Sequence, residues 1–381
     1  MELEGLVPLA DYQPPQLPAE EKVQAVFARF RAMFLARRNQ DIIASERLDT
    51  PSLRRLDEAA QPPACAPLLD DLDRAMRQWM DQPVAAGTVL AIVTPPSDQS
   101  DAVGSWAARR GLAMLLPPDE RTGPLDFAAI EAIPDEGPLV VPRLERWFVR
   151  SSEGIERMRQ LLIILSARRQ VLIGCNSFAW RFLSKAIRLD LIAPGPFTFR
   201  PFDGAMLEKW LVELAAGEMA DGAGFRLAES GNYLLREGAE EETHHFFETL
   251  AGRSLGVPSI AWHMWRDMLR IDELDEHPDG SQGESSRQRE TFWIAAMDEL
   301  VLPGTYPREL LFALHALCLH GSLTPPQLLE VVPDTAGVAM VPALRGSQFI
   351  RFENGELGIR AAAYPAVREG LQTSGFPMGV V

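Results

Sequence analysis

Three apolar runs in the first half of the chain are each followed by residues whose types could take part in phosphate chemistry. Short apolar runs of this kind predict buried strands, and the carboxyl ends of parallel strands meet along one edge of a sheet. At such an edge, backbone N–H groups at a helix N-terminus can hold a phosphate, and carboxylates can hold Mg²⁺. The residues in these positions are Thr94 to Asp101 after VLAIV, Pro142 and Arg143 after LVV, and Asn176 after VLIGC.

The first of these segments, TPPSDQSD at 94–101, lacks the residue types that phosphate binding needs. It has no glycine to let the backbone approach a phosphate and no lysine to meet the phosphate charge. Asp98 and Asp101 instead place carboxylates at the predicted start of a helix, where the helix dipole favours an anion. At about 4 Å and an effective dielectric of about 20, each carboxylate would repel a phosphate charge by about 4 kcal/mol. The pattern favours a helix N-cap formed by Ser97 or Asp98, with Asp101 in the first turn.

The residues that follow the other two apolar runs also lack the acidic side chains that would bind a metal ion. Pro142 and Arg143 stand where acidic residues would hold magnesium, and Glu145 is the nearby carboxylate. We expect Glu145 to be either a surface ion-pair former or a displaced acid. Asn176 has a short polar side chain of the kind that makes turns by bonding its own backbone.

The spacing of the histidines and cysteines indicates no metal centre or nucleophile. None of the six histidines pairs with a cysteine or carboxylate at a zinc spacing. The three cysteines, Cys65, Cys175 and Cys318, lie far apart, and their odd number argues against a disulfide framework. We therefore expect no catalytic residue, no metal and no cofactor.

Composition and charge narrow the class of protein. The chain has 381 residues, 46% hydrophobic and 24% charged, which is typical of a folded protein of roughly two or three domains. Its formal net charge of −16 argues against coating nucleic acid, because such a surface repels phosphate backbones. No signal peptide opens the sequence, and no apolar run approaches the roughly 20 residues that span a bilayer. These features predict an acidic, cytoplasmic protein.

The order of the predicted elements indicates an α/β domain over residues 66–203. A helix at 68–79 precedes the strand at 88–93, and a second helix at 101–110 ends at Gly111. Further helical and apolar segments then alternate up to the strand at 171–175. Strands alternating with helices predict a mainly parallel sheet.

The flanking regions have a different character. Residues 1–65 form an N-terminal extension whose segment 19–43 has helical periodicity with arginines on its other face. That segment is either a packed helix with a solvated face or a helix that docks on a partner or a membrane surface. Residues 204–270 carry three amphipathic helical segments, and 271–302 read as a polar linker. In 303–381, three helices precede a hairpin at Asn354-Gly355, which is the order of a winged helix.

Residues 66–270 resemble the AAA+ and STAND group of P-loop ATPases, in which a winged helix is a common companion domain. The family's phosphate loop, G-x-x-x-x-G-K-[ST], follows a strand and opens a helix. Aligned by spacing, Thr94 and Gln99 stand at its glycines, Ser100 at its lysine and Asp101 at its magnesium-binding hydroxyl. The resemblance thus implies a P-loop fold with helical lid in which the first motif is degenerate.

The same resemblance extends to the later motifs. Pro142 and Arg143 take the place of the family's strand-end acids, so the second motif is degenerate as well. Asn176 matches the family's residue that senses the terminal phosphate, and Arg253 lies where the helical lid often offers a phosphate-sensing arginine. Asn176 and Arg253 therefore match the residue types that the family has at these positions. The positions that bind and split ATP in the family do not match.

The sequence therefore predicts a pseudo-ATPase that acts through protein–protein contacts as a regulatory or scaffolding subunit. Its partner would be another protein, such as an active ATPase relative, or a second copy of this chain. Two alternatives stay open, an atypical nucleotide-binding switch and a winged-helix transcription regulator. The candidate recognition helix at 335–344 is apolar and is followed by Arg345 alone, which argues against DNA.

Overall fold

The computed structural model divides the chain into two compact units, which are described separately. The first unit comprises residues 1–13, 65–200 and 304–381, and the second comprises 14–64 and 201–303. The residues that the structure describes are 3–18, 48–49, 66–81, 88–98, 100–118, 120–135, 137–168, 170–218, 224–228, 233–234, 240–272, 291–297, 300–302, 307–332 and 340–381. The predicted helix at 19–43 lies outside them. Among them, no helix is long and apolar enough to cross a membrane.

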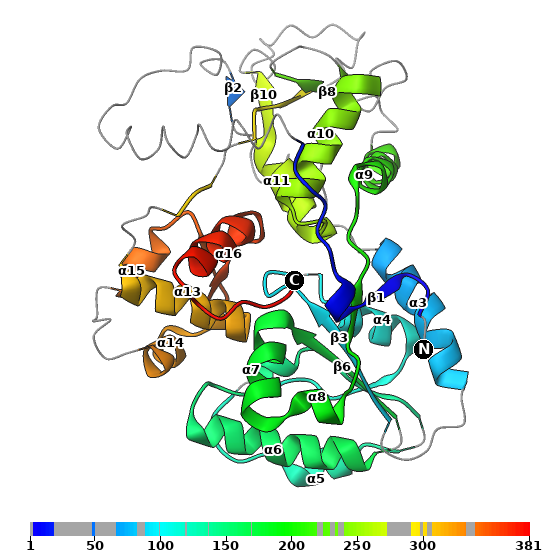
Figure 1. Ribbon diagram of the computed structural model, residues 1–381, viewed down its shortest axis with the longest axis vertical. Coiled ribbons are helices and arrows are strands. Elements are labelled where there is room, and N and C mark those ends of the chain that lie inside the picture. Colours follow the sequence, from blue (N-terminus) through cyan, green and yellow to red (C-terminus); the bar gives the residue numbers. More distant parts are fainter. Residues whose placement is uncertain are drawn as a thin grey trace, which may run out of the picture. The chain divides into compact units, whose positions relative to one another are not determined.

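A six-stranded sheet forms the centre of the first unit (Figure 1). The strand order is β1-β7-β3-β6-β5-β4, and all neighbours run parallel except β1, which is antiparallel to β7. The mixed α/β class and the mostly parallel sheet are as predicted. The strands are β1 (Leu6–Pro8), β3 (Thr88–Thr94), β4 (Ala113–Met114), β5 (Leu139–Val141), β6 (Gln170–Asn176) and β7 (Phe197–Phe199).

The two central strands are buried on both faces, which explains their unbroken apolar sequences. The interior residues of β3 and every residue of β6 are buried. A strand covered by helices on both faces needs apolar side chains at successive positions, not alternating ones. Gly174 on β6 leaves room for close packing, since a Cβ there would lie 2.9 Å from the carbonyl carbon of Pro142.

The helices of this α/β part follow from the direction in which the chain crosses the sheet. From β3 the chain moves to the edge strand β4 and then returns through β5 and β6 to β7. Because crossovers between parallel strands are right-handed, α4 lies on one face and α5, α6 and α7 lie on the other (Figure 1). The helices are α3 (Ala66–Asp81), α4 (Ala102–Arg110), α5 (Phe127–Glu131), α6 (Ser152–Ala167), α7 (Ser177–Ile187) and α8 (Leu189–Ile192).

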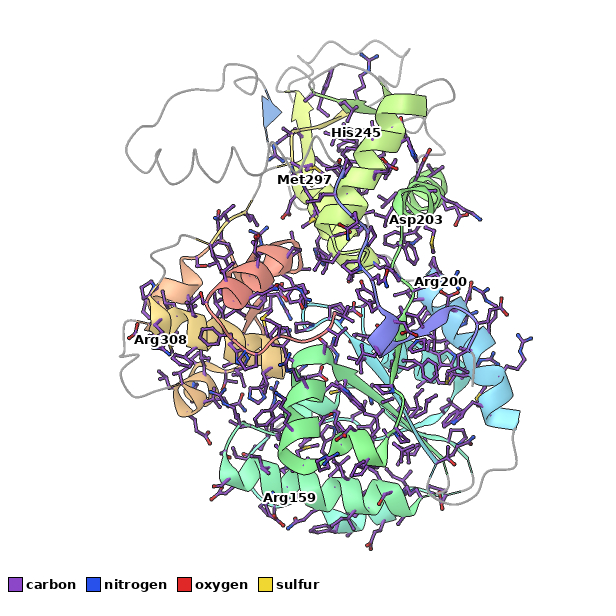
Figure 2. All side chains as sticks on the ribbon, in the orientation of Figure 1. Arg159, Arg200, Asp203, His245, Met297 and Arg308 are labelled. Carbon is purple, nitrogen blue, oxygen red and sulfur yellow. The ribbon has the colours of Figure 1, made fainter. Side chains whose placement is uncertain are left out.

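The amphipathic pattern of these helices matches their burial. On α6, Met158, Leu161 and Leu165 are fully buried, whereas Arg159 lies on the outer side of the helix (Figure 2). Helix α4 ends as predicted at Gly111, which has a left-handed φ of 65°.

The C-terminal part of the first unit has the predicted order of helices followed by a hairpin. A three-stranded sheet, β12-β14-β13, accompanies the helices. Asn354 and Gly355 both have positive φ, 51° and 79°, as the tight turn of a hairpin requires. The elements are α13 (Arg308–His320), β12 (Ser322–Leu323), α14 (Pro325–Val331), α15 (Met340–Arg345), β13 (Ile350–Glu353), β14 (Glu356–Ile359) and α16 (Tyr364–Thr373).

The second unit contains a sheet that the sequence did not predict. Its three helices were expected, whereas the strands that lie within 204–270, predicted as a helical lid, and within 271–302, predicted as a linker, were not. Five strands pair in the order β2-β10-β11-β8-β9. The elements are α9 (Gly204–Glu218), α10 (Glu240–Arg253), α11 (Pro258–Met268), β2 (Leu48–Asp49), β8 (Gly224–Leu227), β9 (Tyr233–Leu234), β10 (Leu269–Asp272) and β11 (Thr291–Ile294).

The strand β11 was missed because its apolar residues are few and follow a long polar stretch. Phe292 and Ile294 are buried, while Trp293 between them is only partly covered, which is the period of two expected for a strand. The ring of Phe225 on β8 lies 5.1 Å from that of Trp265 and 5.8 Å from that of Phe292. These aromatic contacts between sheet and helix form the core of the second unit.

This alternation predicts opposite outcomes for two neighbouring substitutions. Phe292→Ala should lower the free energy of unfolding by about 3–5 kcal/mol, because it empties part of that core. Trp293→Ala should cost about 1 kcal/mol, since it loses mainly a cation–π contact with Arg226. Urea unfolding followed by circular dichroism measures both. Equal losses for the two variants would contradict the orientation of β11.

Candidate functional site

The candidate site lies at the carboxyl ends of β3 and β6. These two strands are neighbours, and Thr94 at the end of one pairs with Asn176 at the end of the other. The helices that follow them, α4 and α7, lie on opposite faces of the sheet, so this is a point at which open α/β sheets form ligand crevices. The structure therefore brings Thr94, Arg143 and Asn176 to one place. Arg253 belongs to the second unit, where it donates a hydrogen bond to the Met297 carbonyl.

The loop after β3 is closed by its own aspartates. The Oδ1 atom of Asp98 accepts hydrogen bonds from the backbone N–H and the hydroxyl of Ser100, at 3.0 and 2.6 Å. Asp101 has a left-handed φ of 42° and caps α4 by accepting the N–H of Gly104 at 3.3 Å. The predicted cap at Ser97 or Asp98 is therefore wrong by three or four positions. Gln99 lies outside the described residues.

Arg143 extends from the end of β5 onto this loop. Its Nη2 atom donates to the carbonyl oxygen of Asp98 at 2.6 Å, and its Nε atom lies 3.7 Å from Oδ1 of Asp101. Both charges are the reverse of what phosphate chemistry needs, with a cation at the strand end and an anion in the loop. The pair is partly exposed, so it contributes at most about 1 kcal/mol, but it fixes where the guanidinium lies. Pro142, which precedes it, offers no side-chain ligand.

Glu145 is buried, which corrects the expectation of a surface ion pair. It lies in the 3₁₀ turn Leu144–Trp147 with 4% of its surface exposed. Its Oε2 atom accepts the backbone N–H of Asn176 at 3.2 Å. Burial raises the pKa of Glu145 above its ordinary value, although the charge of Arg143 opposes this shift.

Asn176 uses both ends of its amide within the protein. Its Oδ1 atom caps α7 by accepting the N–H of Ala179 at 2.8 Å, which is the local role expected from its sequence position. Its Nδ2 atom donates to the carbonyl oxygen of Leu319 near the end of α13, at 3.0 Å. The next turn contains Gly321, where a Cβ would lie 3.8 Å from Glu145 and 4.0 Å from the carbonyl of Pro96. The C-terminal part therefore packs directly over the strand ends.

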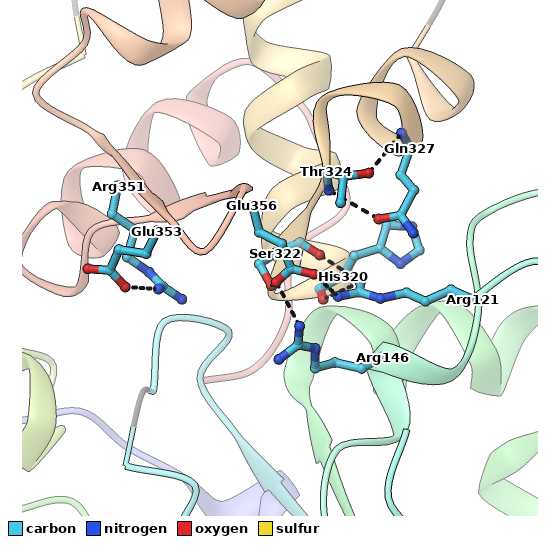
Figure 3. Close-up of polar contacts among 9 residues, drawn as sticks. All are labelled: Arg121, Arg146, His320, Ser322, Thr324, Gln327, Arg351, Glu353 and Glu356. Atoms are coloured by element: carbon cyan, nitrogen blue, oxygen red, sulfur yellow. Dashed lines mark hydrogen bonds and ion pairs between the residues drawn. The ribbon is translucent and has the colours of Figure 1, made fainter. Parts of the chain in front are cut away.

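A cluster of charges beside this contact joins the same two parts of the first unit (Figure 3). Arg121, which is 2% exposed, donates to the carbonyl of Ser322 at 2.6 Å and to Oε1 of Glu356 at 3.1 Å. Arg146 donates to Oε2 of Glu356 at 2.7 Å, and the Ser322 hydroxyl donates to the same oxygen at 2.6 Å. We refer to Arg121, Arg146, Ser322 and Glu356 as the bridging cluster.

The protonation of the bridging cluster follows from its burial. Burial lowers the pKa of Arg121 to about 10, with the charge of Arg146 adding to the shift. Burial opposes ionisation of Glu356, but the Ser322 hydroxyl and the two guanidinium groups outweigh it and lower the pKa of that carboxyl. A charged Glu356 between two arginines is therefore the stable state.

His320 completes the contact, although the sequence indicated no metal or catalytic role for any of the six histidines. Its ring is fully buried and lies edge-on to the ring of Phe148, with 5.0 Å between the ring centres. Burial holds the pKa of His320 well below its ordinary value, and the charges of Arg121 and Arg150 lower it further. A neutral imidazole can pack there, whereas an imidazolium would bury a further positive charge near two arginines.

Taken together, these side chains hold the α/β part and the C-terminal part of the first unit against each other. Carboxylates and amides that could serve a metal or phosphate already bind protein groups. Within the described part of the chain, no three His, Cys, Asp or Glu side chains gather as a metal site. Cys175 and Cys318 are both buried, and burial raises the pKa of each thiol.

The comparisons with known proteins find similarity in structure alone. No protein-family model and no curated protein matches the chain. Cdc6p from Pyrobaculum aerophilum is 12% identical over 82% of this chain and 95% of its own, with a TM-score of 0.32. A RuvB mutant from Thermotoga maritima is 14% identical over 57% of this chain and 63% of its own, at 0.31. A Walker-type ATPase of Pyrococcus abyssi is 13% identical over 75% and 90%, at 0.26.

These similar structures are P-loop ATPases. Every TM-score lies below 0.5 and every identity below 25%, so the likenesses say nothing about what this chain binds or catalyses. The geometry of its own strand ends carries the functional argument.

The buried His320 predicts how stability changes with pH. Its pKa is depressed in the folded state, so its contribution is present above the unfolded pKa of about 6.5 and is lost as pH falls. Between pH 7 and pH 5 the wild-type chain should lose up to about 2 kcal/mol more unfolding free energy than His320→Leu. Below its pKa the unfolded histidine binds one more proton than the folded one, and this changes the unfolding free energy by about 1.36 kcal/mol per pH unit. Urea unfolding at several pH values measures this. Parallel profiles for the two proteins would show that His320 is not buried as a neutral ring.

Proposed function

We propose that this protein is an ATPase-like chain that neither binds nor splits ATP and that acts through protein–protein contacts as a regulatory or scaffolding subunit. The observation that carries the proposal is the position of Arg143, which reaches from the strand end to the Asp98 carbonyl and towards Asp101. In this arrangement a fixed cation of the protein meets the loop carboxylate where a nucleotide-binding chain would hold metal and phosphate.

Three further contacts support the same proposal. The side-chain amide of Asn176 is bonded to the Leu319 carbonyl, so a terminal phosphate would have to displace α13 to reach it. The carboxylate of Glu145 is turned to the backbone of Asn176 and is buried, which raises its pKa and weakens it as a magnesium ligand. We infer that the degenerate motifs have been converted into a contact between two parts of one unit.

We further propose that the chain consists of a degenerate AAA+-like domain and a C-terminal winged helix. The order of helices and hairpin over residues 307–381 supports the second part. On this reading, α15 is the recognition helix and β13–β14 form the wing. Its basic residues are already engaged, since the Arg345 guanidinium lies 3.8 Å from the centre of the Phe352 ring and Arg351 pairs with Glu353 at 2.6 Å. Such a surface suits protein partners in the cytoplasm, either an active ATPase relative or a second copy.

ATP turnover tests the central part of this proposal. The purified chain should hydrolyse ATP no faster than buffer, because a lysine is missing at Ser100 and acids are missing at Pro142 and Arg143. Restoring the loop with Asp98→Gly, Gln99→Gly, Ser100→Lys and Asp101→Thr should still give no hydrolysis, since Arg143 stays at the strand end. Phosphate release measures both proteins. Turnover by the wild-type chain that Glu145→Gln abolishes would contradict the proposal.

Binding to duplex DNA tests the competing regulator hypothesis. The full chain should not shift random duplex at low salt, because a module that binds DNA neutralises several phosphates and this hairpin balances its own charges. A gel-shift titration with and without Arg345→Ala measures this. A low-salt shift that the substitution removes would favour a winged-helix transcription regulator instead.

A further inference from the structure

Residues 377–381 lie in a groove formed by three helices of the first unit. Helices α7, α13 and α16 contribute side chains that bond to a main-chain oxygen of every residue in the segment. The contacts are His315 Nε2 to Pro377 at 3.1 Å, Arg181 Nη1 to Met378 at 2.5 Å, Arg368 Nη1 to Gly379 at 3.0 Å and Nη2 to Val380 at 3.1 Å, and Ser177 Oγ and Tyr364 OH to Val381 at 2.7 Å each.

These donors make a built site and not a chance contact. Tyr364 is fully buried and Ser177 is 1% exposed, so both hydroxyls are committed to the groove. Burial lowers the pKa of His315 to about 4, so the ring is neutral, and because the Pro377 carbonyl can only accept, the ring carries its proton on Nε2. Side chains thus bond to main-chain oxygens of five consecutive residues. In peptide recognition such main-chain hydrogen bonds give affinity, and pockets for side chains give specificity.

The groove also selects by side-chain size at one position. A Cβ on Gly379 would lie 2.7 Å from the Cβ of Ser177 and 2.9 Å from its carbonyl carbon, which is closer than van der Waals contact allows. Val381 is 3% exposed and fills the inner end, whereas Val380 is 46% exposed. The sequence requirement is therefore a glycine followed, two positions later, by an apolar residue.

Beside Val380 the groove opens into a hollow of about 550 Å³ along α7. Arg181, Lys185 and Arg188 line it, together with one acid, Asp190, which pairs with Arg188 at 3.1 Å. The hollow therefore carries an excess of positive charge on a chain whose net charge is −16. A ligand side chain that enters it from the position of Val380 would be acidic.

We propose that this groove is a binding site for an extended peptide of a partner protein, with glycine at the position of Gly379 and an acidic residue next to it. Residues 377–381 occupy the site in cis and compete with that peptide. The segment is joined to α16 by a turn at Ser374 and Gly375, and Gly375 has a positive φ of 76°. The inference rests on the proposal that the protein acts through protein contacts and names the chemistry of one such contact.

The chain's own residues 377–381 compete with any added peptide, and a binding experiment must allow for this. A tethered segment has an effective concentration of about a millimolar or more, so a free peptide of equal affinity cannot displace it at low concentration. Binding in trans must therefore be measured on a full-length chain whose own segment cannot seat. Gly379→Val provides it, because the added side chain meets Ser177 while every donor of the groove is kept.

The experiment uses fluorescent peptides with the sequence Phe-Pro-Met-Gly-Val-Val, which is that of residues 376–381. The Gly379→Val chain should bind it at least tenfold more tightly than the wild-type chain does. A peptide with alanine in place of the glycine should bind at least tenfold more weakly. A peptide with glutamate in place of the first valine should bind several-fold more tightly at low salt, and Lys185→Ala should remove that gain.

A second measurement covers the case in which Gly379→Val does not fold. In the wild-type chain, the glutamate peptide at several millimolar, which exceeds the effective concentration of the tethered segment, should increase hydrogen exchange in the chain's own residues 376–381. Unchanged exchange, or equal binding of the glycine and alanine peptides by the folded variant, would overturn the proposal. Neither readout involves nucleotide, so a failure here leaves the ATP result as it stands, and ATP turnover would not count against the groove.

Discussion

Arg121 holds a guanidinium at 2% exposure, and the arrangement of the first unit depends on how that charge is satisfied. A buried charge is stable only when it is paired and hydrogen-bonded, and removing one partner of such a pair costs about 3–5 kcal/mol. The partners of Arg121, which are the carbonyls of His320 and Ser322 and the carboxylate of Glu356, all belong to the C-terminal part of the unit. The α/β part therefore carries a cation that is satisfied only when the C-terminal part is docked, and docking places α13 over the ends of β3 and β6.

This docking gives a physical account of the residues at the strand ends. Under the proposed function no phosphate binds here, because the Leu319 carbonyl accepts the amide of Asn176 and Arg143 lies against the loop, so the loop needs neither glycine nor lysine. Aspartates there become useful, because Asp101 caps α4 and Asp98 holds the turn before it. Under the proposed function, the same residues that oppose nucleotide binding stabilise the loop and the contact that covers it.

The sequence predicted the elements whose signal is local and missed the contacts between distant segments. Strands β3 and β6 and the hairpin at Asn354-Gly355 were predictable, because unbroken apolar runs and turn residues specify them directly. The antiparallel edge strand at Leu6–Pro8 and the strand at Thr291–Ile294 were not, because such short segments become strands only through partners far away in the chain. Burial of Glu145 was missed for the same reason, because the helix that covers it, α13, lies about 170 residues further along the chain.

The most direct test of the account is hydrogen exchange at the strand ends with and without saturating Mg·ATP. The account predicts unchanged exchange in residues 94–110 and 170–187, because the loop and the start of α7 are already held by protein groups. It also predicts slow exchange of Leu323 and its neighbours in β12, which pairs with β14 in the docked part. Nucleotide-dependent protection of the loop at 94–101, with faster exchange in β12 as α13 is displaced, would contradict the claim that this contact has replaced nucleotide binding.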